Sequence, residues 1–212
     1  MVKLTKRTSP PQPIATENDY RSNPNFSALV EDCYGKCYIC ENDKATTLNV
    51  EHRIPYRGDV SLKYDWQNLF LSCGHCNNIK RDFYDNILDP TKCDPEKNIS
   101  LSLNTDTLIE SVVVITLSDD ESSKQTSELL SYVYNGGATA IKDVECAILR
   151  NEISSCIARF LQYIKSYHEE PDEGYEAIIE KEILRSSAFA AFKRGIIRND
   201  VELSVKFEAL LV

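Results

Sequence analysis

The sequence of 212 residues lacks the features of a membrane or secreted protein. It has no run of 18 apolar residues, so we expect no membrane-spanning helix. No apolar segment follows residues 1–7, so we also expect no signal peptide. Both absences predict a cytoplasmic protein, and in a reducing compartment cysteines bind metals more often than they form disulfides.

A surplus of basic residues, typical of DNA-binding surfaces, is also lacking, and the net charge is −9. Residues 1–85 carry 11 basic and 11 acidic side chains, whereas residues 86–212 carry 13 basic and 22 acidic ones. Because acidic side chains repel DNA over a Debye length of about 8 Å, the second region is a poor platform for DNA. We therefore expect weak intrinsic DNA affinity and docking of this region onto a basic partner surface.

What the sequence does contain is two closely spaced cysteine pairs, Cys37 with Cys40 and Cys73 with Cys76. Zinc takes four thiolates in a tetrahedron, and each CxxC turn supplies two of them. In a plain zinc ribbon roughly 15–20 residues separate the pairs, whereas 32 residues separate Cys40 from Cys73. The spacing therefore predicts a structural zinc site with a segment inserted between its halves. The alternative is four unrelated free or disulfide-bonded cysteines, for which two such spacings would be a coincidence.

The inserted segment has the pattern of a β-hairpin followed by a helix. A β-prone stretch leads into Glu51 and His52, a turn signal follows at residues 56–59, and Asn68 precedes an apolar run. Asn77 lies where a helix can open. We predict a compact ββα unit, and hence an α+β fold.

These residues resemble the motif of the HNH endonucleases, which have a ββα-metal fold. That motif is an acidic residue plus His, then Asn, then His or Asn just after the second cysteine pair. Glu51, His52, Asn68 and Asn77 occupy these positions, and Asn77 follows Asn68 by nine residues, as in the family. The chain departs from the commonest pattern in having Glu51 for Asp and Asn77 for the final His.

The resemblance implies metal-dependent hydrolysis of DNA phosphodiester bonds. His52 is the expected general base, because an imidazole titrates near neutral pH. Glu51 and Asn77 offer hard oxygen ligands for Mg²⁺ or Mn²⁺, with Asn78 as the alternative to Asn77. Asn68 is expected to brace the hairpin or to orient His52 through its amide.

Three cations near the motif, Arg53, Lys80 and Arg81, are the expected contacts for DNA phosphates. For Lys80 and Arg81 the alternative is an ordinary solvated helix face.

The remainder of the chain is not required for such a unit. Strict alternation at residues 99–104 and β-branched residues at 111–117 predict a β-hairpin. Apolar residues at helical spacing predict a long helix over residues 139–169 and a second over residues 175–197. The apolar stripe of the first helix is Ile141, Val144, Ile148, Ile153, Ile157, Phe160, Leu161 and Ile164.

We accordingly divide the chain into two regions. Residues 1–98 form the HNH nuclease unit with its zinc knuckles. Residues 99–212 form the hairpin and helical region, which docks a partner or serves as a scaffold.

The order of the motifs also resembles the HNH subunit, PtuB, of Septu-type anti-phage systems, including those carried by retrons. This resemblance implies a bacterial defence nuclease that acts with an ABC-type ATPase of the PtuA kind. In retron systems a reverse transcriptase and its RNA–DNA product join them. Two alternatives remain, a standalone restriction-type HNH nuclease, which would bind DNA unaided, and a non-catalytic zinc-binding module.

Overall fold

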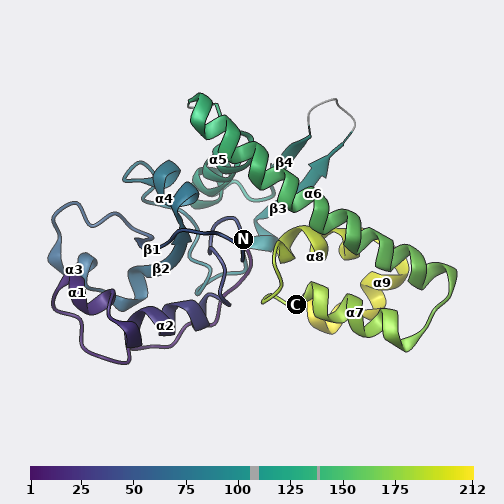
Figure 1. The fold of residues 1–212 in the computed structure, drawn as a ribbon, viewed down its shortest axis with the longest axis horizontal. Coiled ribbons are helices and arrows are strands. Elements are labelled where there is room, and N and C mark those ends of the chain that lie inside the picture. Colours follow the sequence, from purple (N-terminus) through teal and green to yellow (C-terminus); the bar gives the residue numbers. More distant parts are fainter. Residues whose placement is uncertain (106–109, 138) are drawn as a thin grey trace.

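The computed structural model describes residues 1–105, 110–137 and 139–212. It combines two small antiparallel hairpins with helices, which confirms the predicted α+β fold. The ββα unit lies toward one end of the molecule and the last helices lie at the other, and the long helix α6 (Ala140–Glu169) runs from near α5 (Glu121–Asn135) to those last helices (Figure 1). Within the described ranges, no helix combines the length and hydrophobicity needed to cross a membrane.

The predicted ββα unit is present. Strand β1 (Leu48–His52) pairs antiparallel with β2 (Leu69–Cys73), which places His52 opposite Leu69, and α4 (Gly74–Lys80) follows directly. The same part of the chain contains the short helices α1 (Glu17–Tyr20), α3 (Val60–Lys63) and η1 (Trp66–Asn68), whereas η2 (Pro95–Lys97) contacts β3 (Ile99–Asn104).

Strand β2 is buried along its whole length, which explains its continuous apolar run. Leu69 joins Leu29 of α2 (Asn23–Asp32) in a small hydrophobic cluster. Phe70 belongs to the main core of the molecule. Packing of this kind fixes the register of the hairpin, and the register sets the position of His52 at the end of β1.

The second predicted hairpin is also present. Strand β3 (Ile99–Asn104) pairs antiparallel with β4 (Ser111–Thr116), with Ile99 opposite Thr116. Strand β3 packs on α8 (Ala190–Asn199) and β4 packs on α5 (Glu121–Asn135). Part of the connection between the strands, residues 106–109, lies outside the described residues.

The long predicted helix is confirmed as α6 (Ala140–Glu169). Thr139 caps its N-terminus by accepting a hydrogen bond from the backbone N–H of Lys142. The other helices of this region are α5 (Glu121–Asn135), α7 (Glu173–Ile183), α8 (Ala190–Asn199), α9 (Val201–Lys206) and α10 (Glu208–Leu211).

The prediction of a single helix over residues 175–197 is wrong, because α7 ends at Ile183 and α8 begins at Ala190. The backbone adopts an extended conformation at Leu184 and a left-handed conformation at Phe189, where φ is 52°. Phe189 is buried and donates its N–H to the carbonyl of Glu41 at 3.2 Å. A contact with a distant part of the chain therefore interrupts the helical pattern.

The predicted apolar stripe of α6 is correct only in part. Four of its members are exposed, namely Ile141, Val144, Ile148 and Leu161, whereas Ile153, Ile157, Phe160 and Ile164 are buried. In the first turns the buried positions are instead Cys146 and Leu149. These two continue the spacing of three and four residues set by the buried side chains further along, so the exposed residues lie on other sides of the helix.

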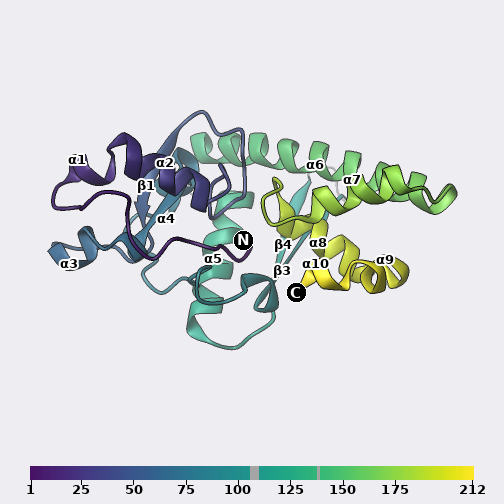
Figure 2. The ribbon, with the colours of Figure 1, turned by 90° about the horizontal axis from the view of Figure 1, so that it is seen from below.

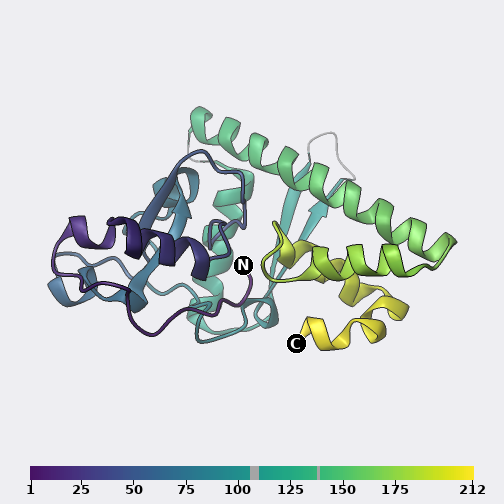
Figure 3. The same ribbon diagram turned by 60° about the horizontal axis from the view of Figure 1, so that its bottom comes forward.

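One hydrophobic core joins the two regions that we divided after residue 98. It contains all four cysteines of the zinc knuckles together with Leu130 and Val133 of α5 and Leu149 of α6. The Nε2 atom of His75 lies 2.8 Å from the carbonyl oxygen of Val133 and adds a polar link between α4 and α5. Figures 2 and 3 show α6 lying along both regions. The division after residue 98 thus stays a prediction about function.

Candidate active site and zinc centre

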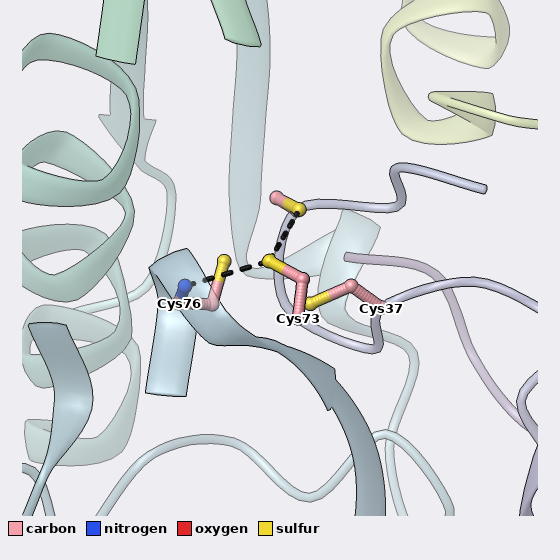
Figure 4. Close-up of side chains that lie close together, drawn as sticks. Cys37, Cys73 and Cys76 are labelled. Carbon is pink, nitrogen blue, oxygen red and sulfur yellow. Dashed lines mark hydrogen bonds between the residues drawn. The ribbon is translucent and has the colours of Figure 1, made fainter. Parts of the chain in front are cut away.

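The four predicted zinc ligands, Cys37, Cys40, Cys73 and Cys76, lie in one buried cluster (Figure 4). Their sulfur atoms are all within 4.8 Å of one another. The sulfurs of Cys40 and Cys73 are 3.8 Å apart, which is too far for a disulfide bond of about 2.05 Å. A tetrahedron with Zn–S bonds of about 2.3 Å has edges of about 3.8 Å. The cluster therefore fits a zinc ion.

The thiols of the cluster differ in how readily they ionise: hydrogen bonds with Cys37 and Cys73 raise the pKa of Cys40 well above its usual value, and burial does the same for Cys76. Cys73 ends β2 and precedes α4, and its sulfur accepts a hydrogen bond from the N–H of Cys76 at 3.4 Å. Burial opposes ionisation, but hydrogen bonds from the three other thiols hold the pKa of Cys37 well below its usual value. Because the two pairs flank the hairpin, a metal bound here clamps both of its ends.

His52 stands at the end of β1 in a concave site of about 540 Å³, which we call the catalytic cleft. Its Nε2 atom lies 2.9 Å from the carbonyl oxygen of Lys63. A carbonyl can only accept a hydrogen bond, so Nε2 carries the proton and Nδ1 is left as a free base. Burial lowers the pKa of His52 and favours the neutral ring. Tyr20 and Tyr56 orient the ring, with centroids 5.7 and 4.9 Å from that of His52.

Asn68 clamps the loop between the two strands. Its amide oxygen accepts from the N–H of Ile54 at 2.8 Å. Its amide nitrogen donates to the carbonyls of Ile54 at 2.8 Å and Leu62 at 3.1 Å. Leu62 precedes Lys63, whose carbonyl holds His52. Of the two roles expected for Asn68, the geometry therefore fits bracing of the hairpin, through which His52 is positioned by the backbone.

Asn77 lies in α4 and lines the catalytic cleft together with Arg81. Among the residues that the structure describes, the Asn77 side chain has no hydrogen-bond partner, so its oxygen is available to a cation. The alternative residue, Asn78, is exposed and lines neighbouring surfaces instead of this cleft.

Two arginines of the cleft, Arg57 and Arg81, have positive backbone φ angles of 43° and 45°. Such conformations cost about 1–3 kcal/mol each and persist only where the surroundings enforce them. Arg57 is held by its bonds to the carbonyl of Asp82 at 2.6 Å and to the carboxylate of Asp85 at 3.0 Å. The strained loops thus bring two cations to the cleft that contains His52.

Glu51 lines the catalytic cleft, but it and Lys80 are paired inside the fold, and the roles predicted for both stay predictions. Both are buried, and Nζ of Lys80 lies 2.7 Å from Oε1 of Glu51 and 2.9 Å from the carbonyl of His52. The other carboxylate oxygen accepts a hydrogen bond from the Tyr38 hydroxyl at 2.7 Å. Burial raises the pKa of Glu51, although Lys80 and Tyr38 favour its ionised form. A metal at Glu51 or a phosphate at Lys80 would therefore have to compete with this buried ion pair.

Arg53, another predicted phosphate contact, also has partners within the fold, and its predicted role stays a prediction. Its guanidinium donates to the carbonyl of Ile87 at 2.8 Å and lies 3.5 Å from the carboxylate of Asp89. Arg53 is largely buried there and fastens β1 to the segment that follows α4. Of the three predicted phosphate contacts, Arg81 is the one that lines the cleft.

Tyr20, Tyr56 and Arg57 also line the cleft, although the sequence pattern did not predict a role for them. Tyr56 and Arg57 follow His52 by four and five residues, in a segment that we interpreted only as a turn. Proximity to His52 was the available signal for these two. Tyr20 comes from α1, which the sequence pattern did not predict.

Known proteins match the part of the chain that builds this site. The HNH endonuclease family matches residues 37–83. The Septu protein PtuB of Bacillus thuringiensis is 32% identical over 81 residues, which cover 35% of this chain and 31% of that relative. The match thus spans about a third of the curated relative. No solved structure gives a significant match. The family match encloses both cysteine pairs and the ββα unit, and the chain carries an HNH endonuclease domain at residues 37–83.

Proposed function

We propose that the chain is a metal-dependent endonuclease that hydrolyses DNA phosphodiester bonds, with His52 as its general base. The observation that carries this proposal is the 2.9 Å contact between Nε2 of His52 and the carbonyl of Lys63, because it leaves Nδ1 unprotonated. The lowered pKa of His52 and the two arginines of the cleft support the same chemistry. The match to the HNH endonuclease family supports it independently.

In this mechanism Nδ1 of His52 takes a proton from water as the water oxygen attacks phosphorus. The bond to the leaving oxygen breaks, and that oxygen takes a proton from solvent. Arg57 and Arg81 offset the negative charge on the phosphate oxygens. When bound, a divalent cation such as Mg²⁺ or Mn²⁺ would stabilise charge on the phosphate and the leaving oxygen. We propose Asn77 as its protein ligand, because a neutral amide oxygen suits a hard cation that keeps several of its waters.

Zinc has a structural role in this proposal. Four thiolates fill a tetrahedral site and leave no position open for substrate. The four cysteines lie in the buried core, and none of them lines the open cleft. Zinc would therefore stabilise the hairpin, and the divalent cation would act on the phosphate.

We further propose that the nuclease acts in anti-phage defence with an ABC-type ATPase, which residues 99–212 bind. The likeness to a Septu protein supports the defence role. The acidic surplus of the region supports a basic partner surface. Ile141, Val144 and Ile148 give α6 an exposed apolar stripe, and apolar anchors contribute most of the affinity of docked surfaces.

A plasmid-cleavage assay with and without Mg²⁺ tests the nuclease proposal. His52→Ala should lower the rate by roughly 10²–10⁴-fold, because it removes the base. His168→Ala is the matched control, since His168 lies at the far end of α6 and contacts Asp200 at 2.9 Å. Cleavage by His52→Ala at the wild-type rate would refute the proposed base.

Co-purification with an ABC-type ATPase of the PtuA kind tests the partner proposal. A truncation after residue 98 would open the shared core, so a point variant is the better probe. Ile148→Asp should reduce co-purification, whereas Leu161→Asp, also at an exposed position of α6, should not. Full cleavage activity without the ATPase would favour a standalone nuclease.

A further inference from the structure

A second concave surface, which we call the aromatic groove, adjoins the catalytic cleft. It has a volume of about 570 Å³, and Arg81, Phe83, Tyr84, Glu128 and Tyr132 are among its lining residues. The groove lies where the end of α4 packs against α5. Arg81 lines both the groove and the catalytic cleft, so the two surfaces meet at this side chain.

Two aromatic rings of the groove are open to solvent. Phe83 is 70% exposed and Tyr132 is 43% exposed, whereas Tyr84 is buried. A single exposed apolar side chain on a protein surface needs no explanation. Two aromatic rings beside an arginine in one concave site, however, are the combination with which proteins stack unpaired bases.

The groove contains a positive charge at Arg81 and a negative charge at Glu128. The guanidinium of Arg81 donates to the carbonyl of Asn78 at 3.0 Å and has no other partner among the described residues. Burial, together with the negative charge of Glu128, raises the pKa of Tyr84 to about 12. Glu128 would repel a phosphate chain lying along the groove, but a carboxylate can accept a hydrogen bond from a base amino group. The groove therefore suits a base whose phosphate lies at Arg81.

We propose that the aromatic groove binds an unpaired nucleobase of the DNA strand being cut, stacked against Phe83 and Tyr132. Arg81 holds the adjoining phosphate at the catalytic cleft. This inference rests on the proposed nuclease function and specifies its substrate. DNA with a single-stranded or gapped segment is preferred over a continuous duplex, because a paired base does not expose its face for stacking.

The test uses the full-length, zinc-loaded His52→Ala protein, which binds DNA without cutting it. Its dissociation constants are measured by fluorescence anisotropy at low salt for single-stranded DNA, blunt duplex, duplex with a one-nucleotide gap, and single-stranded RNA. We expect gapped DNA to bind about tenfold more tightly than duplex. Adding Phe83→Ala should weaken single-stranded and gapped binding by about five- to hundredfold and leave duplex binding within about twofold.

Two further variants separate stacking from other effects. Phe83→Trp should retain the preference, because indole also stacks on bases. Val201→Ala, a truncation of a side chain on α9 that is 87% exposed, should change nothing. Equal binding of gapped DNA with and without Phe83→Ala overturns the inference, as does an absence of any DNA binding at low salt. Tighter binding of RNA than of DNA overturns the assignment to DNA.

A cleavage assay with the wild-type protein shows separately whether the nuclease proposal itself fails. In that case the wild-type protein cuts none of the DNA substrates in a His52-dependent way. If only the groove inference fails, the wild-type protein cuts gapped and continuous DNA at equal rates, and Phe83→Ala changes neither rate.

Discussion

Replacement of Lys80 by methionine tests the buried pair beneath the catalytic cleft. Lys80 is 0% exposed, and its ammonium lies 2.7 Å from Glu51. Lys80→Met leaves that carboxylate buried with the Tyr38 hydroxyl as its remaining side-chain partner. Removing one member of a buried ion pair costs about 3–5 kcal/mol. That is a large part of a typical total stability of about 5–15 kcal/mol, so we expect a much lower unfolding midpoint.

The loss should depend on pH. Without Lys80, Glu51 avoids a buried charge by taking up a proton, so its folded-state pKa rises further above its unfolded value of about 4.3. Between those two values the folded protein binds more protons than the unfolded chain. The stability of the variant therefore falls as pH rises through this window, by up to about 1.4 kcal/mol per pH unit. Lys80→Met should be closest to wild type at the acidic end of the window.

Urea unfolding with zinc in constant excess measures these effects for Glu51→Gln, Lys80→Met and the double variant. The double variant replaces the ion pair by two neutral side chains, so its loss should be smaller than the sum of the single losses. Lys165→Met, which breaks an exposed pair on α6, is the control and should change stability little. Single losses below about 1 kcal/mol, or strictly additive losses, would refute the reasoning. If Glu51→Gln keeps full stability but needs more Mg²⁺ for cleavage, Glu51 is a metal ligand, as its motif position implied.

Metal analysis should find one zinc ion per chain, and Cys37→Ser should unfold the ββα unit, because structural zinc contributes on the order of 10 kcal/mol of apparent binding energy. Cys156→Ser, outside the cluster, should stay folded, and a folded zinc-free Cys37→Ser protein would contradict this expectation. The cleavage rate should rise with pH through a value below 6.5 and then level off, because burial lowers the pKa of His52 and only the neutral ring accepts a proton. A rate that first rises well above neutral pH would point to another base. Asn68→Ala removes three hydrogen bonds from a buried site and should lower the unfolding free energy by about 1–3 kcal/mol. It should also slow cleavage, because the loop that presents the Lys63 carbonyl loosens; unchanged kinetics would show that His52 does not depend on this clamp.

The sequence by itself determined those features that depend on short-range geometry. Cys37 and Cys40 come together through a single turn, and so do Cys73 and Cys76, so spacing alone indicated a zinc site. Strict alternation predicted the strand at residues 99–104, and helical spacing predicted α6 from Ala140 to Glu169. The motif order placed His52 at the end of a strand and Asn77 in the following helix.

Only the tertiary structure decided the environment of each charged side chain. Lys80 meets Glu51 from 29 residues away, and Arg53 meets the carbonyl of Ile87 from 34 residues away. The end of the helical pattern before Phe189 likewise depends on a contact with the distant residue Glu41. The physical reason is that the free energy of a charged or polar group depends on the groups and the water around it in space. Residue type and spacing show which chemistry a side chain offers, but burial and partners decide whether it is directed at a substrate or consumed within the fold.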